Sequence, residues 1–146
     1  MIDIKIKRLR GDAKLPTRAT AESAGYDVYA CDAATLPTGG SVMIPLGFSV
    51  EIPQGYELQV RSRSGLAAKN QVFVTNSPGT IDSDYRGEVK VLLSRLPGPD
   101  PFPFWIYQGD RVAQLVLAVV PQSQIVEVTE VSDTGRGSGG FGSTGA

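Results

Sequence analysis

Three segments of this chain combine charged, hydroxyl and glycine residues in patterns that could bind a phosphorylated ligand. In the first, Arg63, Ser64 and Gly65 bring a guanidinium, a hydroxyl and backbone amides to the start of a short helix-forming stretch. Such an arrangement can bind an anion. Taken alone, Ser64 is more simply interpreted as the ordinary N-cap of that helix. The segment therefore indicates an anion site only if other parts of the sequence agree.

The second segment, residues 79–87, places two carboxylates, a tyrosine and an arginine between glycines. We interpret it as a tight hairpin whose backbone donors and acceptors could read the edge of a flat polar ring. Asp82 is then the candidate to orient a water molecule, and Tyr85 is the candidate to pack against a sugar. The alternative is a surface loop with solvated charges, and the segment alone does not decide between the two.

The third segment is the glycine-rich C-terminus, residues 133–146. Glycines let backbone N–H groups approach phosphates closely, Arg136 adds charge, and Ser143 and Thr144 add hydroxyls. Phe141 has no core to join there, so we expect it to stack on a ligand. A plain disordered tail is the simpler alternative. The composition predicts an arm that is mobile until something binds it.

The overall composition excludes several kinds of chemistry. The 146 residues include no histidine and one cysteine, which rules out a Ser-His-Asp triad, a Cys-His pair and an internal zinc site. One cysteine cannot form an internal disulfide, which fits a reducing compartment. The net charge of −1 argues against binding DNA or an anionic membrane through the overall field. The N-terminus lacks the apolar core of a signal peptide, so we expect a cytoplasmic protein.

The elements that must position these segments are mostly short strands. The 17 glycines and 10 prolines disfavour long helices and predict strands joined by turns. Alternating side chains predict strands over residues 2–6, 25–30, 42–52, 56–60, 71–75, 88–93, 111–120 and 124–131. One or two turns of helix are predicted after Ser64. We expect an all-β, jelly-roll-like barrel or sandwich over residues 1–132, followed by the mobile arm, residues 133–146.

Five blocks of the sequence, in order, resemble the trimeric deoxyuridine triphosphatase (dUTPase) family. The blocks are residues 24–30, 63–67, 76–88, 109–115 and 136–145. Each block alone is a modest signal, but all five in this order over nearly the whole chain are specific. The resemblance implies a jelly-roll-like homotrimer with three active sites between subunits. It also implies hydrolysis of dUTP to dUMP and pyrophosphate with Mg2+, which limits uracil in DNA and supplies dUMP for thymidylate synthesis.

The resemblance further implies a role for each matching residue. Asp82 would act as general base, helped by Gln114, so that water attacks the α-phosphorus, and Asp27 would hold the metal through its waters. Tyr85 would pack under the deoxyribose and exclude a 2′-hydroxyl. The implied substrate contacts are Arg63, Ser64 and Gly65 on the phosphates from a neighbouring chain, Asn76, Gly79, Thr80 and Ile81 around the uracil, and Arg136, Phe141, Gly142, Ser143 and Thr144 on the arm of a third chain.

The sequence departs from the family pattern at two places, and two other functions stay open. Residues 70–73 lack an expected His-Gly-like turn, and the proline-rich link 96–107 is longer than typical, with Trp105 interpreted as an interface residue. A dCTP deaminase shares the fold, but the phenylalanine-bearing arm and the hairpin around Asp82 favour the triphosphatase. A regulatory trimer that binds dUTP without catalysis is the second alternative. The presence of Asp82 together with Gln114 argues against it.

Overall fold

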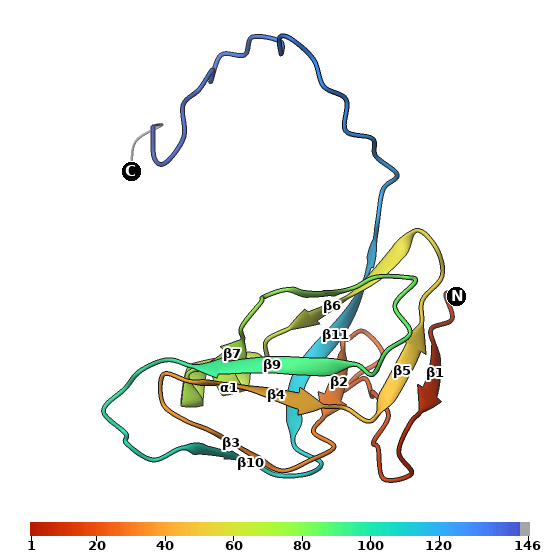
Figure 1. The fold of residues 1–146 in the computed structure, drawn as a ribbon, viewed down its shortest axis with the longest axis vertical. Helices are drawn as coiled ribbons and strands as arrows, with labels where there is room; N and C mark the ends of the chain where they lie inside the picture. The colour runs from red at the N-terminus through yellow and green to blue at the C-terminus, as the bar shows by residue number, and fades with distance from the viewer. Residues whose placement is uncertain (144–146) are drawn as a thin grey trace.

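The computed structural model describes residues 1–143 as short antiparallel strands with one helix (Figure 1). The strands are short because turns containing glycine or proline separate most of them. In chain order the elements are β1 (Lys5–Arg8), β2 (Tyr26–Tyr29), β3 (Ala34–Leu36), β4 (Ser41–Pro45), β5 (Phe48–Glu51), β6 (Tyr56–Arg61), α1 (Ser64–Asn70), β7 (Val72–Val74), β8 (Gly79–Ile81), β9 (Lys90–Arg95), β10 (Phe104–Ile106) and β11 (Arg111–Val119).

Two sheets enclose the core. One has four strands in the order β2-β11-β6-β8, the other has three in the order β4-β9-β7, and the pairs β1-β5 and β10-β3 stand beside them. Alternate side chains of both sheets point inward and are buried, as Val60 and Leu115 are in the first sheet and Val91 is in the second. The predicted all-β fold with one short helix is confirmed. Of the two predicted forms, the described residues adopt the sandwich, since the sheets do not close into a barrel.

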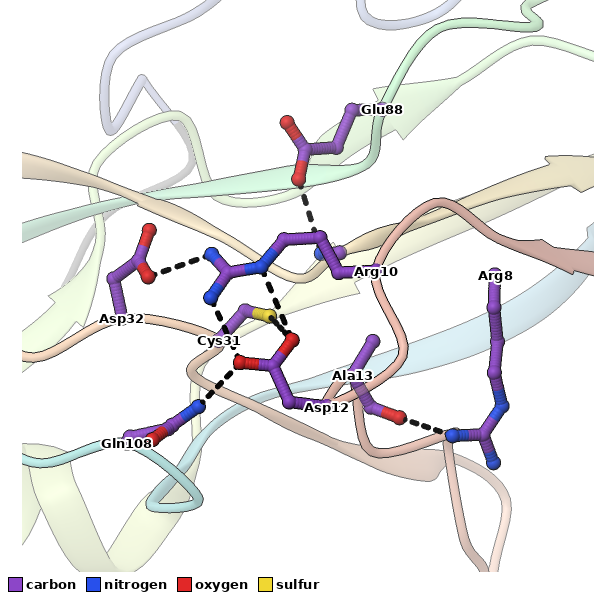
Figure 2. Close-up of polar contacts among 9 residues, drawn as sticks. Arg8, Arg10, Asp12, Ala13, Cys31, Asp32, Glu88 and Gln108 are labelled. Carbon is purple, nitrogen blue, oxygen red and sulfur yellow. Dashed lines mark hydrogen bonds and ion pairs between the residues drawn. The ribbon is translucent and has the colours of Figure 1, made fainter.

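The loop after β1 is fixed to the body by a polar cluster (Figure 2). Arg10 donates two hydrogen bonds to Asp12, at 3.1 and 2.8 Å, and one to Asp32 at 2.6 Å, while the Gln108 amide donates to Asp12 at 2.9 Å. The Arg10 guanidinium holds the pKa of the Asp12 carboxyl below its usual range. Burial raises the pKa of the neighbouring Cys31 thiol, so this cysteine is an unreactive packing residue.

The chain beyond β11 leaves the body as an extended segment (Figure 1). The strand predicted over residues 124–131 is wrong for the single chain, because no described strand lies beside that segment to supply ladder hydrogen bonds. Its apolar side chains are exposed, with Ile125 at 99% and Val131 at 84%. The predicted boundary at residue 132 stays a prediction. Within residues 1–143, no helix has the length and apolarity needed to cross a membrane.

Candidate active site

A buried carboxylate on β2 is the centre of one group of predicted site residues. Asp27 is 4% exposed, and its Oδ1 accepts hydrogen bonds from Arg63 Nε and Gln114 Nε2, both at 3.3 Å. Its Oδ2 accepts one from Arg111 Nη1 at 3.2 Å. A buried charge is tolerated only when it is paired and hydrogen-bonded. Here two guanidinium groups pair with the Asp27 carboxylate, and one amide donates a further hydrogen bond to it. The structure therefore brings together Asp27, Arg63 and Gln114.

The strand register explains this grouping. Gln114 lies directly opposite Asp27 in the β2-β11 ladder, so both side chains project from the same face. Arg111 and Gln114 are three residues apart and would face opposite ways in a regular strand. The ladder is irregular between Arg111 and Ala113, and this bulge turns Arg111 onto the face of Asp27. Sequence reasoning did not select Arg111 as a site residue, although it lies in the block at residues 109–115.

The start of α1 lies next to this group. The helix begins at Ser64, so Arg63 occupies the N-cap position and the predicted N-cap at Ser64 is wrong by one residue. Arg63 makes no side-chain cap; its Nη1 instead donates to the Arg111 carbonyl at 3.1 Å. The first turn holds no acidic residue, and the space that a side chain at Gly65 would fill is open. First-turn amides have no acceptor inside a helix, so this end of α1 suits an anion.

The predicted uracil-reading residues gather at β8. A Cβ at Gly79 would lie 3.2 Å from both the Asn76 amide nitrogen and Val60 Cβ, so the Asn76 side chain stands over Gly79. Asn76, Gly79, Thr80 and Ile81 all border one hollow of about 230 Å3. Its walls offer both backbone and side-chain hydrogen-bonding groups, as the edge of a polar ring requires.

The hairpin predicted over residues 79–87 is wrong for the single chain, because β8 pairs with β6 whereas the next strand, β9, pairs with β4 and β7 in the other sheet. The turn after β8 carries the other two predicted residues of this segment. The Tyr85 backbone N–H donates to the Asp82 carbonyl at 3.2 Å, which closes the turn. The Tyr85 hydroxyl donates to the Glu88 carbonyl at 3.0 Å. The side chains of Asp82 and Tyr85 are both exposed on the same turn. The structure therefore brings together Asp82 and Tyr85.

Asp82 does not reach Gln114 in the same chain. Gln114 pairs with Arg61 and stands at one end of the β11-β6 ladder, whereas Asp82 follows Ile81, which pairs with Leu58. From standard strand spacings, the backbone positions of Asp82 and Gln114 are thus about 13 Å apart along the strands and about 10 Å apart across them, more than the two side chains and one water can span. No single water can contact both groups. The expected cooperation of Asp82 with Gln114 is not possible within one subunit.

The arm carries the remaining predicted residues. Arg136 Nε donates to the Gly139 carbonyl at 2.8 Å, and Phe141 is fully exposed. Gly142 has a φ of +90°, in the left-handed region that glycine adopts without strain. In Figure 1 this part of the chain stands away from the sheets. Thr144 lies outside the described residues.

Residues 11–145 match the sequence model of the family described as dUTPase. The chain belongs to the dUTPase family. It is 49% identical over 142 residues to the deoxyuridine 5′-triphosphate nucleotidohydrolase of Nautilia profundicola, covering 97% of this chain and 98% of that protein. It is 44% identical over 142 residues to the enzyme of the same name from Helicobacter pylori, covering 97% and 96% respectively.

Solved structures agree with this dUTPase membership. The Staphylococcus bacteriophage 80alpha dUTPase with dUpNHpp superimposes with a TM-score of 0.88 at 26% identity, over 99% of each chain. A mutant dUTPase from phage phi11 of S. aureus, which coordinates a structural Mg(II) ion, shares the fold with a TM-score of 0.80 at 22% identity, over 88% of this chain and 97% of that one. The predicted jelly-roll-like fold is confirmed.

In this dUTPase-family chain the predicted site residues fall into three groups. They are the Asp27 group (Asp27, Arg63, Ser64, Gly65 and Gln114), the hairpin group (Asn76, Gly79, Thr80, Ile81, Asp82 and Tyr85) and the arm group (Arg136, Phe141, Gly142 and Ser143).

Proposed function

We propose that this chain is a dUTP diphosphatase, which hydrolyses dUTP to dUMP and pyrophosphate. The reaction limits uracil incorporation into DNA and supplies dUMP for thymidylate synthesis. Family membership and relatives that carry the name of this activity support the proposal. The observation that carries it is the gathering of Asn76, Gly79, Thr80 and Ile81 around one hollow, with Asp82 and Tyr85 on the turn that follows.

The chemical step needs one base and no covalent intermediate. Asp82 takes a proton from water, the water oxygen bonds to the α-phosphorus, and the bond from that phosphorus to the bridging oxygen breaks to release pyrophosphate. The base is a carboxylate on an exposed turn, which a chain without histidine can supply. The arm closes over the substrate, with Phe141 stacked on the uracil, and excludes bulk water.

Charge stabilisation falls to the Asp27 group and the start of α1. Arg63, with its guanidinium 3.3 Å from Asp27, is the residue that turns to the α- and β-phosphates. Arg111 remains on Asp27 and keeps that buried carboxylate compensated. The open first-turn amides at Ser64 and Gly65 add donors for the negative charge that grows as pyrophosphate departs. Arg136, Ser143 and Thr144 of the arm bind the γ-phosphate.

Mg2+ is the proposed cofactor, and the donor set fits it. Residues 1–143 hold no group of three or more Cys, Asp or Glu side chains placed to bind a metal ion by themselves. Mg2+ commonly uses one or two carboxylates, substrate phosphates and several waters. Asp27 Oδ2 accepts only one hydrogen bond, from Arg111, which leaves an oxygen lone pair for a water-mediated contact. Bound there, the ion would neutralise phosphate charge.

The active form is a homotrimer with sites shared between subunits. Asp82 and Gln114 are too far apart in one chain to serve one water, so a complete site draws its hairpin group and its Asp27 group from different subunits. The arm group, far from both in Figure 1, comes from a third. Three copies of three groups make three sites, which suits a closed threefold assembly.

The exposed segment 124–131 supplies a means of assembly. Its side chains at Ile125 and Val131 are open to solvent in the single chain. A groove of about 510 Å3 runs along residues 1–6 and reaches the apolar side chains of Leu58 and Leu115. The described ladder pairs β1 only with β5, so the outer edge of β1 is also open. Segment 124–131 of one subunit therefore docks in this groove of its neighbour and becomes the strand that the sequence predicted.

A panel of nucleotides with Mg2+ tests the proposed function. We expect pyrophosphate release from dUTP and little from dCTP, dTTP or UTP. Ammonia release from dCTP would instead indicate the deaminase. Binding of dUTP without pyrophosphate release would indicate the regulatory trimer. Either of these two outcomes alone would overturn the proposed function.

A further inference from the structure

Gly87 lies against the aromatic ring of Tyr85 and has no conformational reason to be a glycine. Its φ is not in the left-handed region, so the backbone there would accept other residues. A Cβ at Gly87 would lie 2.6 Å from Tyr85 Cζ and 3.0 Å from Cε2, and closer still to the hydroxyl oxygen. Real Cβ atoms do not approach other atoms this closely. The ring of Tyr85 therefore occupies the space that any side chain at Gly87 would need.

The backbone on which the ring rests is fixed on its far side. The Glu88 carboxylate accepts a hydrogen bond from the Gly47 N–H at 3.1 Å. Val89 is 1% exposed, and its N–H donates to the Phe48 carbonyl at 2.9 Å while its own carbonyl accepts from Leu46 at 3.1 Å. Because these hydrogen bonds and the burial of Val89 hold the segment after Gly87 in place, a methyl group at Gly87 must displace the ring.

Displacing the Tyr85 ring should lower the stability of the fold only slightly. Tyr85 is 45% exposed, and its one side-chain hydrogen bond is to the Glu88 carbonyl, so the ring can swing outward into solvent. The effect of a methyl group at Gly87 would thus appear in what Tyr85 does for the substrate rather than in stability.

We propose that Gly87 is a positioning residue that sets the choice of deoxyribose over ribose. It lets the hydroxyl end of the Tyr85 ring lie against the backbone, and in that place the ring fills the space of a 2′-hydroxyl. The proposal rests on the proposed function, in which Tyr85 is the sugar contact. The ligand class it discriminates against is the ribonucleoside triphosphates.

The test compares kcat/KM for dUTP and for UTP in four variants of the full chain. In Gly87→Ala, we expect the ratio of kcat/KM for dUTP to kcat/KM for UTP to fall about tenfold. This is the lower end of the change in discrimination that one methylene group produces in a binding pocket. The control is Gly11→Ala, because nothing lies within 4 Å of that added Cβ and its φ is not left-handed. We expect Gly11→Ala to keep the wild-type ratio. The ratio does not depend on the fraction of folded enzyme, so a merely structural effect would leave it unchanged.

Tyr85→Ala and the double variant Tyr85→Ala/Gly87→Ala complete a double-mutant cycle. Once the ring is gone, Gly87→Ala should change the ratio no further. An unchanged ratio in Gly87→Ala, or an equal further fall in the Tyr85→Ala background, overturns the proposal. If Gly87→Ala alone melts early, a normal melting temperature for the double variant supports the contact, and an equally early one overturns it. A wild-type chain inactive on dUTP would instead be a failure of the proposed function.

Discussion

The two aspartate side chains of the proposed active site, Asp27 and Asp82, differ in burial and in hydrogen bonding. Asp27 is almost fully buried and is compensated by Arg63, Arg111 and Gln114. Asp82 is exposed on a turn, where a water and a phosphate can both approach. A carboxylate enclosed by cationic donors is suited to fix other groups, and an open one is suited to accept a proton. The two aspartates thus lie in different surroundings, which supports the different roles that we propose for them.

At this scale, Asp82→Asn tests the base. The amide keeps the shape of the side chain but cannot take a proton from water, so we expect kcat to fall by about 10²-fold or more. The dissociation constant for dUTP, measured by calorimetry, should stay within about twofold, because loss of the base removes the proton transfer and leaves the substrate contacts in place. Asp84→Asn on the same turn is the matched control and should remain active. Wild-type turnover in Asp82→Asn would remove this residue from its role.

At the scale of elements, local pattern predicted strands well and pairing poorly. Alternation located β2, β6, β7 and β11 to within a residue or two of their observed ends. It missed β3 and β10, which exist because Thr35 and Trp105 pair across the chain. It also predicted a strand at 124–131 that the single chain cannot pair. A strand forms only beside a partner strand, and that partner can be distant in sequence or belong to another molecule. The bulge that turns Arg111 toward Asp27 likewise depends on the pairing of β11 with β2, which lies far away in the sequence.

The end of α1 supports a prediction about stability. Gln71 caps the helix with a φ of 58°, and its N–H donates to the Ala67 and Leu66 carbonyls. A side chain is disfavoured in this left-handed conformation, whereas glycine adopts it freely. Gln71→Gly should therefore raise the free energy of unfolding by about 0.5–1 kcal/mol, measured in urea. Gln71→Ala keeps a Cβ at the same φ and should give no such gain; an equal gain would refute this explanation.

For the whole molecule, the separation of the hairpin group from the Asp27 group is the decisive feature. Mixed trimers test it. Asp82→Asn and Arg63→Ala chains, each inactive alone, are unfolded together and refolded. If sites combine groups from different subunits, about a quarter of the sites in an equal mixture receive both native residues, and activity returns to that level. Each variant refolded by itself is the control. No recovery from the mixture would mean that both groups of a site come from one chain.

Two truncations separate assembly from closure at the same scale. Removing residues 133–146 should leave a particle of three chains by light scattering but abolish most turnover, because segment 124–131 remains and the arm group is lost. Removing residues 121–146 should also dissociate the particle, because the exposed apolar segment is then gone. Full activity of the shorter deletion would contradict the role of the arm, and a stable trimer of the longer one would contradict docking in the groove along residues 1–6.

The distance between Asp82 and Gln114 has a consequence for how such a catalyst behaves at low abundance. In the proposed trimer, a folded subunit on its own holds only part of each active site, because its Asp82 and Gln114 lie far apart. Specific activity must then decline on dilution once subunits begin to dissociate, and it must return when the solution is concentrated again. Turnover is in this sense a property of protein concentration as well as of sequence.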